Sequence, residues 1–156
     1  MAFNCHRPAF AGKAVYIITT SGGGSSNHTI NTIKNAFTSW GMNFAGSSKF
    51  RTGALMDSVE IELEYNSKIE KAAEGLLKAV KNNLAQRPTL YSLIAFKVQQ
   101  KSWQKATQRK ETIDYQYWQS NEWLQRNCNY YIPNEASFLK VKFARLIGNI
   151  VAIFFI

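Results

Sequence analysis

Cysteine and histidine are scarce in this chain, and their scarcity excludes several classes of protein. The two cysteines, Cys5 and Cys128, are too few for the disulfide framework of a small secreted domain, so a reducing, cytoplasmic setting is expected. With two histidines and no Cys-x-x-Cys pair, the sequence has no closed zinc site, and no metal is predicted. A secretory signal peptide is not expected either, because residues 1–10 include His6 and Arg7 rather than an apolar stretch.

Long hydrophobic runs are also missing. The most apolar segment, residues 146–156, would reach only about 16 Å as a helix, roughly half of a bilayer's hydrocarbon core, so it cannot span a membrane. Three basic residues precede it: Lys140, Lys142 and Arg145. We therefore expect this tail either to lie peripherally on an acidic membrane surface, or to pack as a terminal helix against the domain or another subunit.

Acidic residues are few relative to basic ones. The chain has 19 Lys and Arg against 10 Asp and Glu, a net charge of +9, and residues 66–156 hold fourteen of these cations but only six of the acids. A helix is predicted after Pro88, and four basic residues recur along it at four-residue spacing, which would stack them on one face: Lys97, Lys101, Lys105 and Arg109. Such a face attracts acidic partners, but no fold that reads bases is recognisable, so specific nucleic-acid binding is not expected.

The most informative stretch is an apolar run that ends in three glycines. Residues 14–18 (Ala-Val-Tyr-Ile-Ile) are followed by small polar residues and glycines, and a helix is then predicted from Asn27 to Trp40, ending at Gly41. A strand, a glycine loop and a helix in this order form ligand sites in α/β proteins, because the loop and the helix N-terminus present backbone N–H groups to electron-rich ligands. Glycine there permits close approach and a positive φ. A tight turn capped by Ser26 or Asn27 is the structural alternative.

A second βα unit is predicted behind the first. Residues 42–45 fit a short apolar strand, which the small polar residues 46–48 would close with a loop. The strict alternation of residues 58–65 fits an edge strand or an extended linker. A helix is then predicted from Ser67, which has capping-box spacing to Glu70. Its expected apolar stripe comprises Ile69, Ala73, Leu76, Leu77, Val80 and Leu84.

These segments together resemble the flavodoxin-like FMN reductase family, and more narrowly its NAD(P)H-dependent oxidoreductases with a long C-terminal extension. The resemblance begins with Cys-His-Arg-Pro-Ala-Phe-Ala-Gly-Lys at residues 5–13 and continues through the glycine loop to the helix end at Trp40-Gly41. It extends over nearly the whole chain, with later matches at Pro88-Thr89-Leu90, Phe96-Lys97, residues 114–118 (Asp-Tyr-Gln-Tyr-Trp), Trp123, Tyr130-Tyr131 and the basic and then apolar tail.

The resemblance implies a fold. It predicts a partial flavodoxin-like α/β portion, a three-layer parallel sheet with few strands, in residues 1–87, followed by a helical, basic C-terminal extension in residues 88–156. Residues 14–18 would be the fourth of five parallel strands, so the family's phosphate-binding loop, which follows its first strand, has no counterpart here. Taking the glycine loop as that phosphate loop would require three or four further buried strands, whereas the sequence after Ala45 turns mostly helical.

The resemblance also implies a function, FMN-dependent oxidoreduction with NAD(P)H as electron donor. Five loop residues are the predicted cofactor-binding set, placed at the edge of the flavin ring: Thr20, Ser21, Gly22, Gly23 and Gly24. No catalytic side chain is predicted, since the flavin carries the chemistry. Without the phosphate anchor this chain should bind FMN weakly or not at all, and its first strand would keep an unpaired edge. A non-catalytic module that pairs with a second chain, or forms a homo-oligomer, through that edge therefore stays open, as does a membrane-surface protein.

Overall fold

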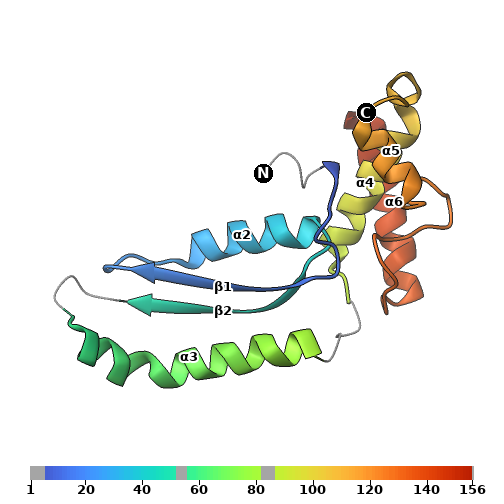
Figure 1. Cartoon of the computed structure of the whole chain (residues 1–156). Helices are drawn as coiled ribbons and strands as arrows, with labels where there is room; N and C mark the ends of the chain where they lie inside the picture. The colour runs from blue at the N-terminus through green and yellow to red at the C-terminus, as the bar shows by residue number, and fades with distance from the viewer. Residues whose placement is uncertain (1–5, 52–55, 82–86, 156) are drawn as a thin grey trace. The chain divides into compact units, whose positions relative to one another are not determined.

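The computed structural model describes residues 6–51, 56–81 and 87–155, and in these residues the protein is mixed α/β (Figure 1). Five α-helices and one short 3₁₀ helix accompany a two-stranded parallel sheet within the described ranges. The α/β class expected from the sequence is thus confirmed. The chain divides into two units: a sheet unit, Lys13–Phe37 with Asn43–Leu84, and a helical unit, Met1–Gly12 with Thr38–Met42 and Ala85–Ile156.

The sheet unit has three layers. Strand β1 (Ala14–Ser21) pairs in parallel with β2 (Asn43–Arg51), and helix α2 (Asn27–Ser39) connects them. Helix α2 lies over one face of the sheet and helix α3 (Ser58–Lys81) over the other (Figure 1). The parallel pairing and the connecting helix are those that the strand, loop and helix pattern predicts.

Strand β2 is longer than the sequence suggests. It continues through Gly46 to Arg51, so the polar loop predicted at residues 46–48 is wrong. The glycine is required by packing rather than by a turn, since a Cβ there would lie 2.7 Å from the ring of Tyr16. The Tyr16 hydroxyl lies 2.8 Å from the Ser48 hydroxyl, and Phe50 is buried further along the strand. The small residues therefore make room for an aromatic side chain inside the sheet.

Helix α3 replaces the edge strand or linker predicted for residues 58–65. Its N-terminus is closed by a reciprocal pair, in which the Glu60 N–H donates to the Asp57 carboxylate at 2.9 Å and the Asp57 N–H donates to the Glu60 carboxylate at 3.1 Å. This capping box starts the helix one residue after Asp57, so the start predicted at Ser67 is also wrong. The alternating residues 58–65 form roughly the first two turns of this helix.

The buried face of α3 is narrower than the predicted apolar stripe. Three residues spaced seven apart face the sheet: Tyr65, Ala72 and Ala79. The ring of Tyr65 meets Phe50 edge-on at 5.2 Å between centroids. Other sides of the helix are exposed. Ile69, Leu77 and Val80 of the predicted stripe lie there, as do Val59 and Leu63. Leu84 lies outside the described residues.

The end of α2 follows the sequence prediction. Gly41 has a φ of +78°, which is the left-handed conformation typical of a residue that ends a helix, and its N–H donates to the carbonyl of Thr38 at 3.1 Å. A side chain at this position would collide with Tyr131, 2.6 Å away. Trp40, predicted as a core residue, is buried.

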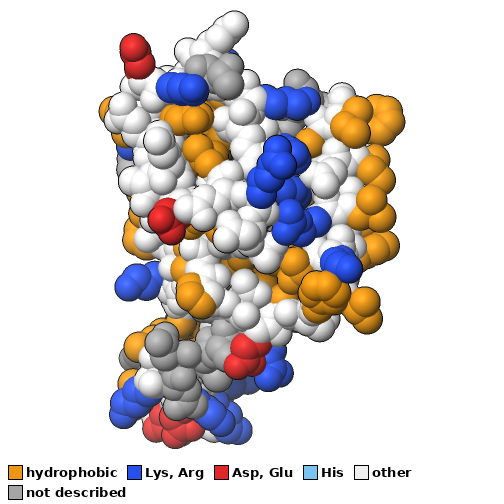
Figure 2. Space-filling view, turned by 90° about the vertical axis from the view of Figure 1, so that its right-hand side faces the viewer, with side chains coloured by type: hydrophobic (Ala, Val, Ile, Leu, Met, Phe, Trp, Pro, Cys, Tyr) orange, Lys and Arg blue, Asp and Glu red, His pale blue; other side chains and the backbone are white. Residues whose placement is uncertain are grey.

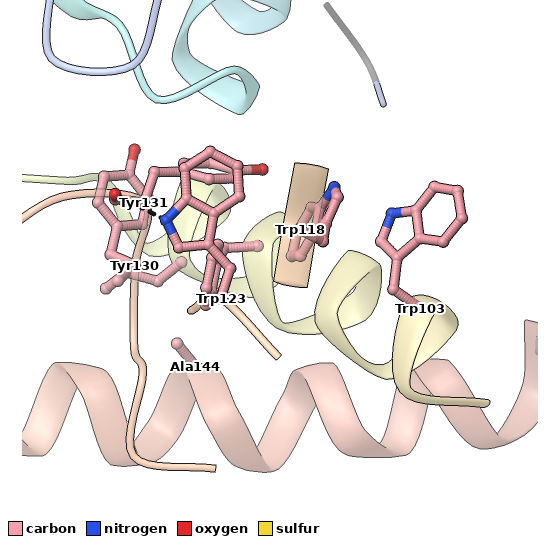
Figure 3. Close-up of a cluster of buried hydrophobic side chains, with 8 residues drawn as sticks. Trp103, Trp118, Trp123, Tyr130, Tyr131 and Ala144 are labelled. Atoms are coloured by element: carbon pink, nitrogen blue, oxygen red, sulfur yellow. Dashed lines mark hydrogen bonds between the residues drawn. The ribbon is translucent and has the colours of Figure 1, made fainter. Parts of the chain in front are cut away.

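Aromatic side chains fill the core of the helical unit (Figure 3). The unit contains α4 (Leu90–Lys105), a 3₁₀ turn (Thr107–Arg109), α5 (Ile113–Ser120) and α6 (Phe138–Phe155). Its core cluster comprises Leu93, Phe96, Trp103, Trp118, Trp123, Tyr130, Tyr131 and Ala144. Two of its three indoles donate to backbone carbonyls: Trp118 to His6 at 2.7 Å and Trp123 to Tyr131 at 2.9 Å.

A buried polar residue organises the loop after α5. The Gln100 side-chain amide is fully buried, and its nitrogen lies 2.7, 2.9 and 3.2 Å from the carbonyl oxygens of Trp123, Gln125 and Cys128. Its oxygen accepts a hydrogen bond from the Lys97 ammonium at 2.6 Å. One glutamine of α4 thus satisfies backbone carbonyls that helices and strands leave unpaired.

Helices α4 and α6 pack closely through a small-residue face. Ala144, Gly148 and Ala152 recur every fourth residue on α6 and are buried, and Gly148 lies against the stem of Lys97. Lys97 is therefore inside the unit, whereas Lys105 is exposed, so the single basic face predicted for residues 97–109 is wrong. Neither α6 nor any other described helix is long and apolar enough to cross a bilayer.

Candidate functional site

The glycine loop lies where the sequence places it, at the carboxyl end of β1. Strand β1 ends at Ser21, and α2 begins at Asn27 after the Ser26 carbonyl has accepted its first helical hydrogen bond, from Ile30 at 3.0 Å. Nothing lies within 4 Å of the position that a Cβ would take at any of the three glycines, residues 22–24. None of the three has a positive φ, so the loop does not use the left-handed conformation that glycine permits. What these glycines provide is open space for close approach to the backbone.

Cations from β2 hold this loop. Arg51 donates to the carbonyl of Gly23, and Lys49 donates to the side-chain carbonyl of Asn27 at the start of α2. The Ser21 hydroxyl closes the loop by donating to the Gly24 carbonyl at 3.0 Å. The carbonyls of Gly23 and Gly24 therefore accept hydrogen bonds from the protein itself. The loop groups that remain to contact a ligand are mainly N–H groups and hydroxyls.

A pocket of about 350 Å³ opens beside the loop. It is lined by Ser21, Gly24, Ser25, Ser26, Asn27, Lys49, Arg51, Glu64, Tyr65 and Lys68. Three of these side chains are cationic and one is acidic, so the lining has an excess of positive charge. Together with the hydroxyls and the N-terminus of α2, this charge favours an electron-rich or anionic ligand group.

Tyr65 lines the pocket and joins two of the elements around it. Its hydroxyl donates to the carbonyl of Arg51 at 2.5 Å, which links α3 to the end of β2. Burial, followed by the neighbouring Glu64 carboxylate, raises the pKa of the Tyr65 phenol, so the group remains a protonated donor at physiological pH. Lys68, one helical turn along α3, places its ammonium over the Tyr65 ring at 4.9 Å from the centroid.

The structure brings together only part of the predicted site. Of the five predicted cofactor residues, Ser21 and Gly24 line the pocket, whereas Thr20, Gly22 and Gly23 do not. The lining residues of α3 were missed because residues 58–65 were expected to form an edge strand or a linker. Lys49 and Arg51 were missed because the predicted second strand ended before them. Lys49 and Arg51 are two residues apart, so they share one face of a strand. Extending the predicted strand to residue 51 would have placed both cations beside the loop.

Other chemically versatile residues form no site. His28 is exposed on the first turn of α2, and no cluster of potential metal ligands occurs in the described ranges. Cys128 is half-buried, and burial raises the pKa of its thiol, which keeps it a weak nucleophile. Lys97 is buried beside Arg145 and Lys101, and desolvation followed by these charges lowers its pKa to about 8.

Comparison with known proteins identifies no relative: no family model matches the sequence, and no curated protein or solved structure gives a significant match.

Proposed function

We propose that the sheet unit supplies the ring-contacting part of a flavodoxin-like FMN site, and that the protein takes part in FMN-dependent electron transfer from NAD(P)H. The observation that carries the proposal is the glycine loop at residues 22–24. It follows the parallel strand β1, precedes the helix α2, and has open space around its three glycines. A flat flavin ring needs this close access to backbone donors along its edge, and bound flavin would supply the hydride chemistry.

The charge around the loop fits this ligand. A flavin gains negative charge on its pyrimidine side when it is reduced, and cations nearby stabilise that form. Lys49, Arg51 and Lys68 line the adjoining pocket, with Glu64 as the one opposing charge. This lining, which includes Ser21 and Gly24 of the predicted site, fits a flavin ring edge.

The edge of the sheet supports a larger flavodoxin-like assembly. Within the described residues β1 pairs only with β2, although its continuous apolar sequence is typical of an interior parallel strand. Ile18 of this strand is 63% exposed, which is unusual for a large apolar side chain in a parallel sheet. Further strands beside β1, with their connecting helices packed on the face of the sheet, would cover it. The same edge favours a second candidate function, a non-catalytic module that pairs with another chain.

Flavin titration tests the ring-edge site. We expect saturable quenching of flavin fluorescence only at large flavin excess, with equal affinity for FMN and riboflavin, because the contacts are made to the ring. Absence of saturable binding would exclude the site. Much tighter binding of FMN than of riboflavin, with competition by inorganic phosphate, would show instead that Ser25 and Ser26 hold the phosphate.

A loop variant and a matched control sharpen this test. Gly23→Val adds a side chain where the structure has open space, so the fold should persist while ring access is blocked. Gly75→Ala in α3 is the control, since its Cβ also meets nothing within 4 Å and lies away from the loop. Light scattering after size exclusion separates the second candidate: an oligomer without flavin binding supports the pairing module.

A further inference from the structure

Helix α6 has two apolar faces of different kinds. The face toward α4 carries the small residues Ala144, Gly148 and Ala152, which are buried. Large apolar residues recur at three- and four-residue spacing on the other side of the helix, and all are exposed: Leu139, Phe143, Leu146, Ile150, Ile153 and Phe154. We call this second set the outer stripe. Leu139 is 77% and Phe154 78% exposed, so the stripe is not covered by the rest of the helical unit.

A contiguous stripe of this size indicates an interaction surface. Monomeric proteins rarely expose large apolar side chains in a continuous row, whereas single exposed ones are ordinary. Hydrophobic side chains form a column along the right-hand edge of Figure 2, beside a group of Lys and Arg side chains. The small face of α6 is already committed to α4, so the helix cannot bury the outer stripe by turning over.

The charge pattern selects the occupant of this surface. Helix α6 contains three cations, Lys140, Lys142 and Arg145, and no acidic residue. Lys140 and Arg145 are half-buried and donate to backbone and side-chain oxygens of the helical unit, so Lys142 is the most exposed of the three. Lys142 is exposed, and its ammonium lies over the Phe138 ring at 4.4 Å from the centroid, next to the outer stripe. A second copy of a chain with net charge +9 would bring like charges together across the stripe, whereas an anionic lipid surface would complement them.

We propose that α6 docks the protein on anionic membranes, lying parallel to the surface with the outer stripe among the lipid headgroups and upper acyl chains. The 18 residues of the helix extend about 27 Å, enough to lie along the interface. No described helix is long and apolar enough to span, so the docking is peripheral. Apolar burial and attraction of the cations act together in this arrangement.

Vesicle co-sedimentation of the full chain tests the proposal. We expect pelleting with vesicles of phosphatidylcholine and phosphatidylglycerol, and at least tenfold weaker binding to phosphatidylcholine alone. Raising the salt from about 0.1 M to about 1 M shortens the Debye length from about 10 Å to about 3 Å and should weaken the binding. Equal, salt-insensitive binding to both vesicle types would overturn the role of anionic lipid.

Matched triple variants locate the surface. Leu139→Ser, Leu146→Ser and Ile153→Ser together should reduce vesicle binding at least tenfold, because they remove half of the outer stripe at exposed positions. The control is Val59→Ser, Leu63→Ser and Val80→Ser in α3, which are equally exposed and should leave binding unchanged. Circular dichroism verifies that both variants fold. Equal losses of vesicle binding in the two triple variants would overturn the proposed docking surface. So would a parent chain that binds no vesicles but forms a dimer that the α6 changes dissociate.

Discussion

Gly148 of α6 lies directly against Lys97 of α4: a Cβ on the glycine would be 2.7 Å from the lysine Cβ and 2.8 Å from its Cγ. Contacts this short cannot be accommodated without displacing a helix or the lysine stem. The pair therefore sets how closely α4 and α6 approach, and it explains why a lysine is found inside the helical unit.

Gly148→Ala should loosen this contact. We expect the free energy of unfolding to fall by about 1–2 kcal/mol, because overpacking costs about 1–3 kcal/mol and alanine recovers up to about 1 kcal/mol of helix propensity. Gly75→Ala in α3 is the matched control and should raise stability by about 0.5–1 kcal/mol, since a Cβ there meets no atom within 4 Å. Urea unfolding measures both. An unchanged or stabilised Gly148→Ala protein would contradict the close packing.

Lys97 should impose a characteristic pH dependence on stability. Burial, followed by Arg145 and Lys101, lowers its pKa to about 8 in the folded chain, from about 10.5 when unfolded. Between these values the unfolded state binds more protons, so this residue makes stability rise with pH from about 8 to about 10.5. Lys97→Met should remove the rise, because methionine does not titrate.

The Cys128 thiol titrates nearby in the opposite sense, because its raised pKa makes stability fall as pH increases. Both proteins are therefore compared in a Cys128→Ala background, by denaturant unfolding at each pH. If the difference between them stays constant from about pH 7 to about pH 10.5, the buried position of the Lys97 ammonium is wrong.

Gln100 should be the most sensitive polar residue of the helical unit. Gln100→Leu keeps the size of the side chain but leaves the Lys97 ammonium and three loop carbonyls without their partner. Each buried polar group left unpaired costs about 1–3 kcal/mol, so we expect a loss of at least about 3 kcal/mol. Thermal unfolding measures this loss. Gln116→Leu, at an exposed position of α5, is the control and should have little effect on stability.

The elements predicted correctly are those that depend on neighbouring residues alone. The apolar run at residues 14–18, the glycines after it and Gly41 at the end of α2 each specify their own conformation, and the structure has all three features. The core position of Trp40 follows from the periodicity of the same helix. Hydrophobic periodicity and the helix-ending glycine are sufficient to predict this segment, because the strand, loop and helix between Ala14 and Gly41 each follow a simple local pattern.

The features that the sequence concealed depend on contacts between distant residues. Gly46 resembles a turn residue until the Tyr16 ring, thirty positions away in the chain, is placed against it. The pocket cations were missed for the same reason, since Lys49 and Arg51 belong to the part of β2 beyond this glycine. Lys97 has the spacing of a surface lysine, and only the glycine of α6 makes room for it inside. Each of these wrong predictions concerns a residue whose packing partner is distant in the sequence and cannot be inferred from its neighbours.

The start of α3 provides a direct test of the capping assignment. Asp57 exchanges hydrogen bonds with Glu60 at the N-terminus, whereas Ser67, the predicted cap, lies exposed within the helix. Asp57→Ala should therefore lower the free energy of unfolding by about 0.5–2 kcal/mol, as loss of an N-cap does. Ser67→Ala should be neutral or slightly stabilising, because alanine has the higher helix propensity. Chemical denaturation compares the two variants with the parent. The opposite ranking would mean that α3 begins at Ser67 and that residues 58–65 are not helical.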